Sequence, residues 1–266
     1  MKFFIKKINN SAVFSRKLLH CLLNTIFFKP KSPKLMKKRT TSLFLSFLAM
    51  IMMSLTSFAQ LSGSYTIDPN GTGTNNYTSF SAATSALSTS GVNGAVTFYV
   101  KQGTYTEQVS LGAYTGASST NTISFESDPT NTTNPVITYA PTASATNYTL
   151  ELNNVNYISL EGLTIETSGS TYARVVSMAG SSNNCITIDN CVFNGTTTTS
   201  TSTFRAIWYA GSAVSHDSLT IENSTFNDGS YCMYALGSSS NLSSNFVFRN
   251  NDVIDFRNGY AVSARY

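Results

Sequence analysis

An eight-residue pattern recurs four times toward the C-terminus and constrains the fold more than any other feature. Four segments align without gaps: 158–165 (ISLEGLTI), 186–193 (ITIDNCVF), 219–226 (LTIENSTF) and 246–253 (FVFRNNDV). Their starts lie 28, 33 and 27 residues apart, and a second pattern follows each, at 172–180, 204–211, 231–237 and 260–265. Repetition at this period indicates a chain built from stacked, similar units.

Apolar and polar residues alternate within these segments, which is the period of a half-buried β-strand. Ile186 and Ile188 would point to one side, and Thr187 and Asp189 to the other. No helical pattern of about 10 to 15 residues separates the strands, so a sandwich of βαβ units is excluded. The sequence therefore predicts an all-β fold, a parallel β-helix with coils about 4.8 Å apart. Further strand-like runs extend it to about six coils: 96–100, 109–111, 123–125, 136–139 and 148–152.

One amphipathic helix is expected before the first coil. Phe80, Ala83 and Leu87 fall at positions i, i+3 and i+7, with Thr78 or Ser79 as the N-cap. Such a helix would shield the core and the edge hydrogen-bonding groups of the first coil. We therefore predict an N-terminal cap region at 60–95 and a β-helix at 96–266. Because 259–266 end inside a strand-like run without a polar cap, we expect the β-helix to be C-terminally truncated.

The first 60 residues differ sharply from the rest in charge. They hold 11 of the 17 Lys and Arg residues and none of the 13 Asp and Glu residues. Residues 61–266 therefore carry 6 basic and 13 acidic side chains, a net charge of −7, with Lys101 as their single lysine. This part of the chain has no basic run, which argues against nucleic acid or anionic lipid as partners.

A secretory signal peptide is predicted at 36–59. A basic stretch at 37–39 precedes an apolar run at 43–55, and small residues stand at positions −3 and −1 of a cut after Ala59. The apolar run is shorter than the roughly 20 residues that span a bilayer, so we expect export and no membrane span after cleavage. Met36 is the better start, and we interpret 1–35 as a spurious N-terminal extension.

Three cysteines remain after cleavage: Cys185, Cys191 and Cys232. They could form one disulfide and a free thiol, or they could be three small buried hydrophobic residues. Their spacing matches no zinc pattern, and only His216 could join them, so no metal site is predicted. His216 and Asp217 are adjacent, but no motif supplies a serine nucleophile for a triad.

Asparagine occupies the same position in three successive repeats, at Asn190, Asn223 and Asn250. An amide turned inward at a corner could donate to the next coil and accept from the previous one. We therefore predict a structural asparagine ladder at this corner.

A column of carboxylates is the one chemically distinctive surface that the repeat predicts. Glu161, Asp189 and Glu222 are equivalent in successive repeats and should point outward about 4.8 Å apart, followed by Arg249. Three interpretations remain open: a raised pKa suited to general-acid catalysis, binding of Ca²⁺ or a sugar, and a solvated outer face. No cofactor is predicted, with Ca²⁺ as the alternative. An outward aromatic side chain from the pair Trp208 and Tyr209 could also stack on a sugar ring.

The N-terminal part of the chain resembles the pectin-lyase-like superfamily. The resemblance rests on 68–73 (DPNGTG), 77–80 (YTSF) and 96–109 (VTFYVKQGTYTEQV), within a stretch of about 45 residues from 67 to 111. Within it, Gly103, Tyr105 and Glu107 match the Gly-x-Tyr-x-Glu of pectin methylesterases. The resemblance implies a right-handed parallel β-helix. The esterase motifs Gln-Asp-Thr and Asp-Phe-Ile-Phe-Gly do not occur, so it implies a scaffold without that mechanism.

A signal peptide followed by β-helix repeats rich in Ser, Thr and Asn also resembles surface proteins of Bacteroidota. We expect a secreted or cell-surface protein that is non-catalytic and adhesin-like or glycan-contacting, with a polysaccharide or cell-surface glycan as partner. The alternative is a carbohydrate-active enzyme (a lyase, hydrolase or esterase) whose catalytic coils are missing from this chain or lie in the acidic column.

Overall fold

The computed structural model describes residues 59–212, 214–237, 242–257 and 262–265, the last four for their backbone only. The chain divides into one unit of residues 1–57 and a second of residues 58–266, and every described residue belongs to the second. The predicted extension at 1–35 and all but the last residue of the predicted signal peptide therefore lie outside the described residues.

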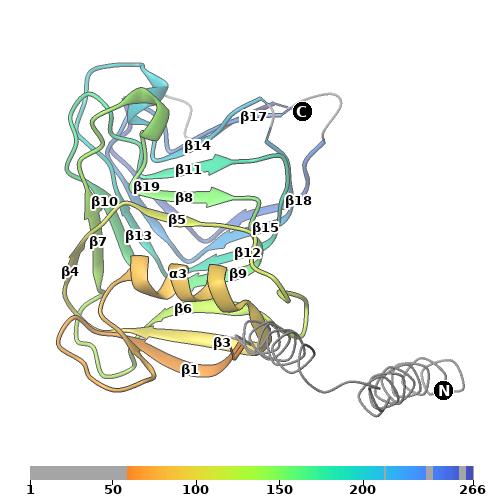
Figure 1. The fold of residues 1–266 in the computed structure, drawn as a ribbon. Helices are drawn as coiled ribbons and strands as arrows, with labels where there is room; N and C mark the ends of the chain where they lie inside the picture. The colour runs from red at the N-terminus through yellow and green to blue at the C-terminus, as the bar shows by residue number, and fades with distance from the viewer. Residues whose placement is uncertain (1–58, 213, 238–241, 258–261, 266) are drawn as a thin grey trace, which may run out of the picture. The chain divides into compact units, whose positions relative to one another are not determined.

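Three parallel sheets wind around one core, as Figure 1 shows, and the chain passes through them in a fixed order. Sheet A comprises β2 (Asn76–Tyr77), β1 (Leu61–Ile67), β3 (Val92–Val100), β6 (Ile123–Ser127), β9 (Asn156–Glu161), β12 (Asn183–Asp189), β15 (His216–Glu222) and β18 (Ser244–Arg249). Sheet B comprises β4 (Thr104–Thr106), β7 (Val136–Tyr139), β10 (Thr164–Thr167), β13 (Val192–Asn194), β16 (Thr225–Asn227) and β19 (Asp252–Ile254). Sheet C comprises β5 (Val109–Leu111), β8 (Leu150–Asn153), β11 (Val176–Ala179), β14 (Trp208–Ala210), β17 (Met233–Leu236) and β20 (Val262–Arg265).

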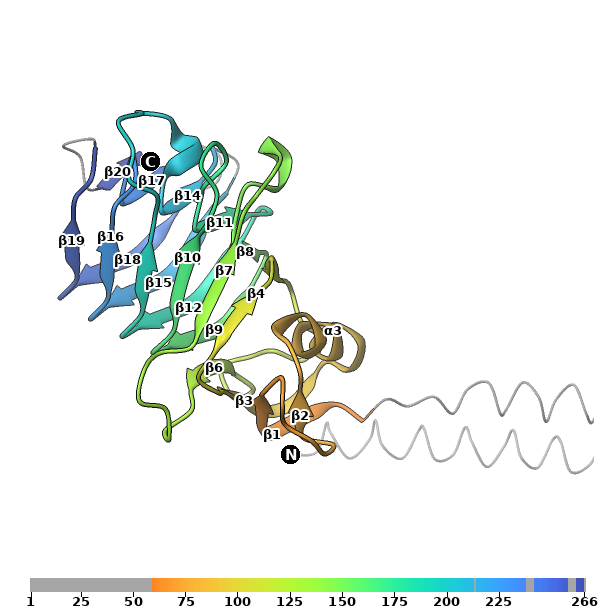
Figure 2. The ribbon, with the colours of Figure 1, turned by 90° about the vertical axis from the view of Figure 1, so that its left-hand side faces the viewer.

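The fold is a parallel β-helix, as the sequence predicted. Ile158, Ile186, Leu219 and Phe246, the first residues of the four aligned segments, pair with one another in that order on β9, β12, β15 and β18. From β3 onward each sheet has six strands, which matches the predicted six coils. Figure 2 shows the strands of sheet B side by side from β4 to β19.

Stacked aromatic rings fill the core at the spacing of the coils. The ring centroids of Phe98 and Phe125 are 4.9 Å apart, and those of Phe193 and Phe226 are 4.8 Å apart. These distances match the roughly 4.8 Å between neighbouring strands. The first pair lies on β3 and β6 of sheet A and the second on β13 and β16 of sheet B. Phenylalanine at the same inward position of two neighbouring coils therefore gives two short ring stacks, and all four side chains are fully buried.

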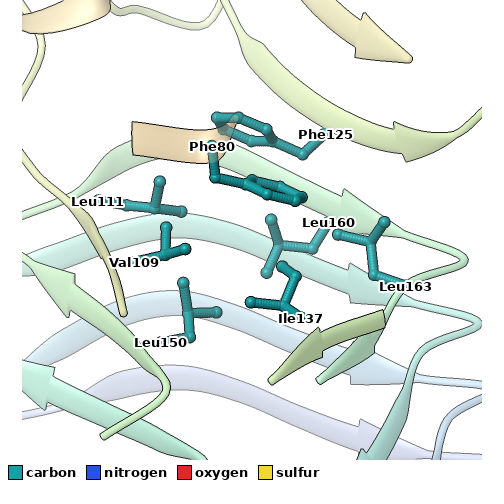
Figure 3. A pocket seen from close by; sticks show the side chains of 8 residues that line it. All are labelled: Phe80, Val109, Leu111, Phe125, Ile137, Leu150, Leu160 and Leu163. Atoms are coloured by element: carbon teal, nitrogen blue, oxygen red, sulfur yellow. The ribbon is translucent and has the colours of Figure 1, made fainter. Parts of the chain in front are cut away.

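Helix α3 (Phe80–Ser90) covers the first coil, and its buried residues are the predicted Phe80, Ala83 and Leu87. Ser79 is the N-cap, and its hydroxyl accepts a hydrogen bond of 3.0 Å from the Ala82 amide. A void of only about 10 Å³ remains beneath the helix (Figure 3). Its lining is entirely apolar, so it offers a water molecule no partner and is not a ligand site.

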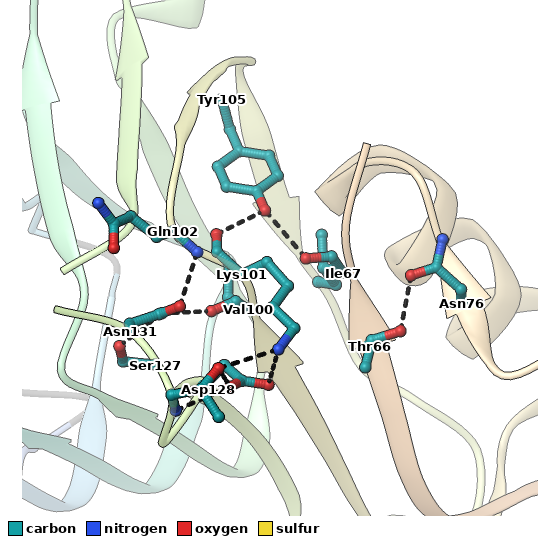
Figure 4. A network of polar contacts seen from close by, with 11 residues as sticks. Thr66, Ile67, Asn76, Val100, Lys101, Gln102, Tyr105, Ser127, Asp128 and Asn131 are labelled. Carbon is teal, nitrogen blue, oxygen red and sulfur yellow. Dashed lines mark hydrogen bonds and ion pairs between the residues drawn. The ribbon is translucent and has the colours of Figure 1, made fainter. Parts of the chain in front are cut away.

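The Gly-x-Tyr-x-Glu segment connects helix α3 to the first coil by hydrogen bonds. Glu107 accepts hydrogen bonds from the amides of Phe80 (3.0 Å) and Ser81 (2.9 Å) and from the Ser81 hydroxyl (2.6 Å). The Tyr105 hydroxyl lies 2.9 Å from the Ile67 carbonyl oxygen and 2.8 Å from that of Lys101 (Figure 4). These residues therefore have a structural role here, because they bind the open end of the solenoid to its lid.

Sheet A extends into the region predicted as the cap, because β1 pairs in parallel with β3. Two short 3₁₀ helices, η1 (Ser144–Thr146) and η2 (Thr203–Arg205), lie in the connections from sheet B to sheet C. Among the described residues, no helix has the length and apolar character needed to cross a bilayer.

Candidate functional site

The carboxylates singled out from the repeat lie in one column on the outer face of sheet A. Asp189 pairs with Glu161 on one side and with Glu222 on the other, and Glu222 pairs with Arg249. The column begins one strand earlier, because Glu126 on β6 pairs with Glu161. Sequence reasoning missed Glu126, although the alternation of 123–126 (ISFE) places it on the outer side.

Most members of this acid column have polar partners within the chain. Arg249 Nε lies 2.6 Å from Glu222 Oε2, and the Asn223 amide donates to Asp189 Oδ1 at 2.8 Å. Glu161, which lies between Glu126 and Asp189, accepts no hydrogen bond from the described residues. Partial burial raises the pKa of Glu161, and the charges of Glu126 and Asp189 raise it further.

The acid column does not gather into a metal cluster. Within the described ranges, no group of three or more His, Cys, Asp or Glu side chains lies close enough to hold a metal ion. The carboxylates follow one another in a row at the spacing of the strands, whereas a calcium site needs six to eight oxygen atoms converging on a point. Binding of Ca²⁺ or a sugar by Glu161, Asp189 and Glu222 stays a prediction.

The predicted asparagine ladder is in register, but its side chains point outward. Asn190, Asn223 and Asn250 are exposed, which corrects the expectation that their amides turn inward. Only one amide contact of the ladder forms, from Asn250 Nδ2 to Asn223 Oδ1 at 3.4 Å. All three residues have positive φ angles of 51° to 54°, and Gly162 at the equivalent position has φ 65°. The left-handed backbone of this corner is the physical reason for asparagine, because Asn and Gly tolerate it best.

A second amide ladder that the sequence analysis missed lies at the ends of the sheet B strands. Asn227 Nδ2 donates to Asn194 Oδ1 at 2.9 Å, and Asn194 Nδ2 donates to Glu166 Oε2 at 3.4 Å. The signal was present, because Phe193–Asn194 and Phe226–Asn227 recur immediately at the end of two aligned segments. This ladder links β10, β13 and β16, whose residues Glu166, Asn194 and Asn227 pair in register.

The outer face of sheet C carries an aromatic column made of tyrosines on two neighbouring strands. Trp208 is buried in the core and Tyr209 points outward, as the alternation predicted. The rings of Tyr209 and Tyr234, on neighbouring strands, are nearly parallel at 5° with centroids 6.1 Å apart. Glu151 and Ser177 occupy the same column on β8 and β11.

Arg174 covers the other side of Tyr209. Its guanidinium carbon lies 3.4 Å from the centroid of the Tyr209 ring and 5.4 Å from that of Phe204. Because β11 and β17 flank β14 on opposite sides, Tyr209 lies between Arg174 and Tyr234. Both faces of this ring are therefore occupied, and the hypothesis of a sugar stacked on Tyr209 is wrong in its geometry.

Arg174 is a desolvated cation without an anionic partner among the described residues. The side chain is largely enclosed, with the residue 9% exposed. Its Nε donates to the Thr203 carbonyl oxygen at 2.9 Å, and no described carboxylate forms an ion pair with it. Burial lowers the pKa of this guanidinium, which nevertheless stays protonated at neutral pH. Buried charges normally find a counter-charge, so Arg174 is the group on this face that most needs an external partner.

The three cysteines are free thiols, and no disulfide joins them. Burial raises the pKa of Cys191 and of Cys232 to about 12, which keeps both thiols protonated and unreactive. Cys191 and Cys232 therefore act as small core residues, whereas Cys185 is only partly buried. The predicted alternative of three buried residues thus holds for two of them.

His216 and Asp217 are neighbours on β15 with different surroundings. Burial lowers the pKa of His216, whose ring lies against Phe246 with centroids 5.6 Å apart. Hydrogen bonds from Ser244 and Asn245 lower the pKa of the exposed Asp217. The Asp217 carboxylate is therefore held by these two partners, and the Ser243 hydroxyl accepts a hydrogen bond of 3.2 Å from the backbone amide of His216, not from its ring.

Comparison with known proteins finds a distant structural likeness. No family model matches the chain, and no curated protein matches it. Among solved structures, the deglycosylated form of the pectin methylesterase from Aspergillus niger aligns with 79% of this chain and 83% of its own, at 13% sequence identity and a TM-score of 0.40.

Proposed function

We propose that this chain is an extracellular or cell-surface β-helix protein that contacts an acidic polysaccharide through the outer face of sheet C without cleaving it. The observation that carries the proposal is Arg174, a nearly buried guanidinium stacked between aromatic rings and lacking a described counter-charge. A uronate carboxylate of a polysaccharide is an external group that would supply the missing charge.

The geometry of a guanidinium suits a carboxylate. Its planar fork can donate two parallel hydrogen bonds to the two oxygen atoms of one carboxylate. Nε of Arg174 is already bound to Thr203 and the guanidinium also has a hydrogen bond to the Tyr209 side chain, which leaves the remaining N–H groups of the terminal nitrogens as donors. The stacked rings of Tyr209 and Phe204 hold the guanidinium plane, so little side-chain entropy remains to be lost on binding.

Tyr209 and Tyr234 would contact a bound sugar through their ring edges and hydroxyl groups. Since Tyr209 has both ring faces covered and Tyr234 packs against Tyr209 and Tyr231, a sugar would approach their hydroxyl groups from the side. These hydroxyls recur on neighbouring strands of one sheet, and a polymer with a repeating unit can contact such a repeating surface at several points.

The distribution of charge supports an acidic ligand at sheet C and disfavours one at sheet A. Glu126, Glu161, Asp189 and Glu222 all lie on the outer face of sheet A, where they would repel an anionic chain. The corresponding column of sheet C contains one described carboxylate, Glu151, which accepts a hydrogen bond of 2.9 Å from Ser110.

Binding of tetragalacturonate, measured by isothermal titration calorimetry, tests the proposal. We expect Arg174→Gln to weaken binding by about tenfold or more, because one charge-assisted contact is lost. Arg249→Gln removes the same charge from sheet A and should leave the affinity unchanged. Equal effects of the two variants, or unchanged binding in Arg174→Gln with an intact circular dichroism spectrum, would contradict the proposal.

A carbohydrate-active enzyme remains the second candidate, because Glu161 has a raised pKa and lies between two other carboxylates. A carboxyl group in such surroundings can serve as a general acid. The wild type and the variant carrying Glu161→Gln, Asp189→Asn and Glu222→Gln can be assayed for reducing ends, unsaturated product and methanol on pectic and other polysaccharides. An activity that the triple variant loses would favour the enzyme over the non-catalytic protein.

A further inference from the structure

A solvent-open groove lies on the outer face of sheet A at its N-terminal end, away from sheet C. Its volume is about 310 Å³, near the lower limit of the roughly 300 to 1,000 Å³ typical of small-molecule sites. One wall is formed by β1 and β3, and the other by the loop 72–76 that leads into β2. Figure 2 shows β1, β2 and β3 together at this end of the solenoid.

Hydrogen bonds hold the loop that forms the second wall. The Thr66 hydroxyl donates to Asn76 Oδ1 at 2.6 Å (Figure 4), and Asn76 Nδ2 donates to the Asp68 carbonyl oxygen at 3.0 Å. Gly71 permits this arrangement, because a Cβ atom there would lie 2.5 Å from Asn76 Oδ1. The groove is therefore formed before any ligand binds, which reduces the entropy lost on binding.

The groove is lined by hydroxyl, amide and phenol groups and by no charged side chain. Hydroxyls and amides both donate and accept hydrogen bonds, so they suit a ligand whose own groups do both. Tyr99 has no aromatic ring packed against it among the described residues, unlike Tyr209 on sheet C. The faces of the Tyr99 ring are thus free of the stacking that covers Tyr209.

We propose that this groove binds a neutral sugar residue, with the sugar ring against Tyr99 and its hydroxyls on the side chains of Thr66, Thr74 and Asn75. A neutral pyranose combines an apolar ring face with polar edges, which matches a phenol surrounded by hydroxyls and amides. Anionic sugars are disfavoured, because no cation lines the groove and Glu126 follows Tyr99 on the next strand. The inference is independent of the proposed contact at sheet C, which concerns another face and an acidic ligand.

Titration of the isotope-labelled protein with cellotetraose, β-1,4-mannotetraose and β-1,4-galactotetraose, followed by NMR, tests this site. At least one of these neutral oligosaccharides should bind with a Kd on the order of 1 mM and shift the amide signals of Thr66, Thr74 and Tyr99. Tyr99→Thr, which keeps a good strand former, should weaken this binding about tenfold. Tyr139→Thr, the same substitution on sheet B, is the matched control and should have no effect.

Three results would overturn the proposal. The first is that none of the three neutral oligosaccharides perturbs the groove signals in a wild-type protein whose spectrum is otherwise that of a folded protein. The second is that Tyr99→Thr binds the neutral ligand as well as the wild type does. The third is that tetragalacturonate shifts the same groove signals more strongly than the neutral oligosaccharides do, or that Arg174→Gln abolishes binding of the neutral oligosaccharides. Either result would show that acidic and neutral ligands share one site. Loss of tetragalacturonate binding in Arg174→Gln with retained neutral binding supports two separate sites.

Discussion

Replacing Glu107 should detach the helical cap from the first coil. The carboxylate accepts three hydrogen bonds from the first two residues of α3, at 2.6 to 3.0 Å, and it also lies at the positive end of the helix dipole. Partly exposed bonds of this kind contribute about 0.5 to 1 kcal/mol each, so Glu107→Ala should lower the free energy of unfolding by about 2 kcal/mol. For a domain of this size the loss corresponds to a decrease in Tm of about 4 to 8 °C.

Hydrogen exchange can locate this loss, because a solenoid is stabilised mainly by contacts between neighbouring units. Amides of α3 and β1 should exchange faster in Glu107→Ala, whereas those of β12 and β15 should be unaffected. Glu166→Ala is the matched control, since Glu166 accepts a single side-chain hydrogen bond, at 3.4 Å. Unchanged exchange in α3, or an equal loss of stability in both variants, would refute the structural role of Glu107.

Three further predictions follow from the acid column, the corner asparagines and the buried thiols. Glu161→Gln should stabilise the protein by about 0.3 kcal/mol at pH 7, because the raised pKa of Glu161 means that its ionisation destabilises the fold. The gain, measured by chemical denaturation, should vanish below about pH 4.3, where Glu161 is protonated in both states. A gain that grows in acid would contradict this reasoning. Asn223→Gly should be tolerated, whereas Asn223→Ala should lower the free energy of unfolding by about 1 kcal/mol, because alanine disfavours a φ of 51°. If thermal denaturation showed equal stability of the two variants, the backbone angle would be excluded as the reason for asparagine. Cys191 and Cys232 should react with a thiol reagent only after unfolding, and rapid labelling of the native protein would show that they are accessible.

The fold was predictable because parallel coils place equivalent residues of each repeat directly beside one another. Once 158–165, 186–193 and 219–226 are aligned, the register of β9, β12 and β15 follows, and the outward column of Glu161, Asp189 and Glu222 follows with it. The cap helix was predictable for a similar reason, since its apolar spacing and its N-cap are local in sequence.

The orientation of the asparagine column could not be deduced from periodicity alone. A recurring asparagine is expected both for a buried amide ladder and for a corner with positive φ, and only the backbone angles distinguish the two. Asn190, Asn223 and Asn250 are exposed and have left-handed backbone angles. Asparagine therefore recurs at this corner because it tolerates a positive φ.

Contacts between coils that are joined by loops of different length could not be predicted from the sequence either. Tyr209 was found by alternation, but the approach of Arg174 to it crosses the longest connection, within the 33-residue repeat. Glu107 similarly reaches residues 26 and 27 positions earlier in the chain. Such contacts depend on how loops fold over the coils, which repeat alignment does not determine.

Methyl NOEs between successive coils test the stacked register most directly. Ile158, Ile186 and Leu219 pair in order on β9, β12 and β15, so methyl groups of neighbouring coils should lie about 5 Å apart and those two coils apart about 10 Å. The account predicts cross-peaks from Ile158 to Ile186 and from Ile186 to Leu219, and none from Ile158 to Leu219. A direct cross-peak from Ile158 to Leu219 without the other two would contradict the parallel β-helix and, with it, the placement of every surface described above.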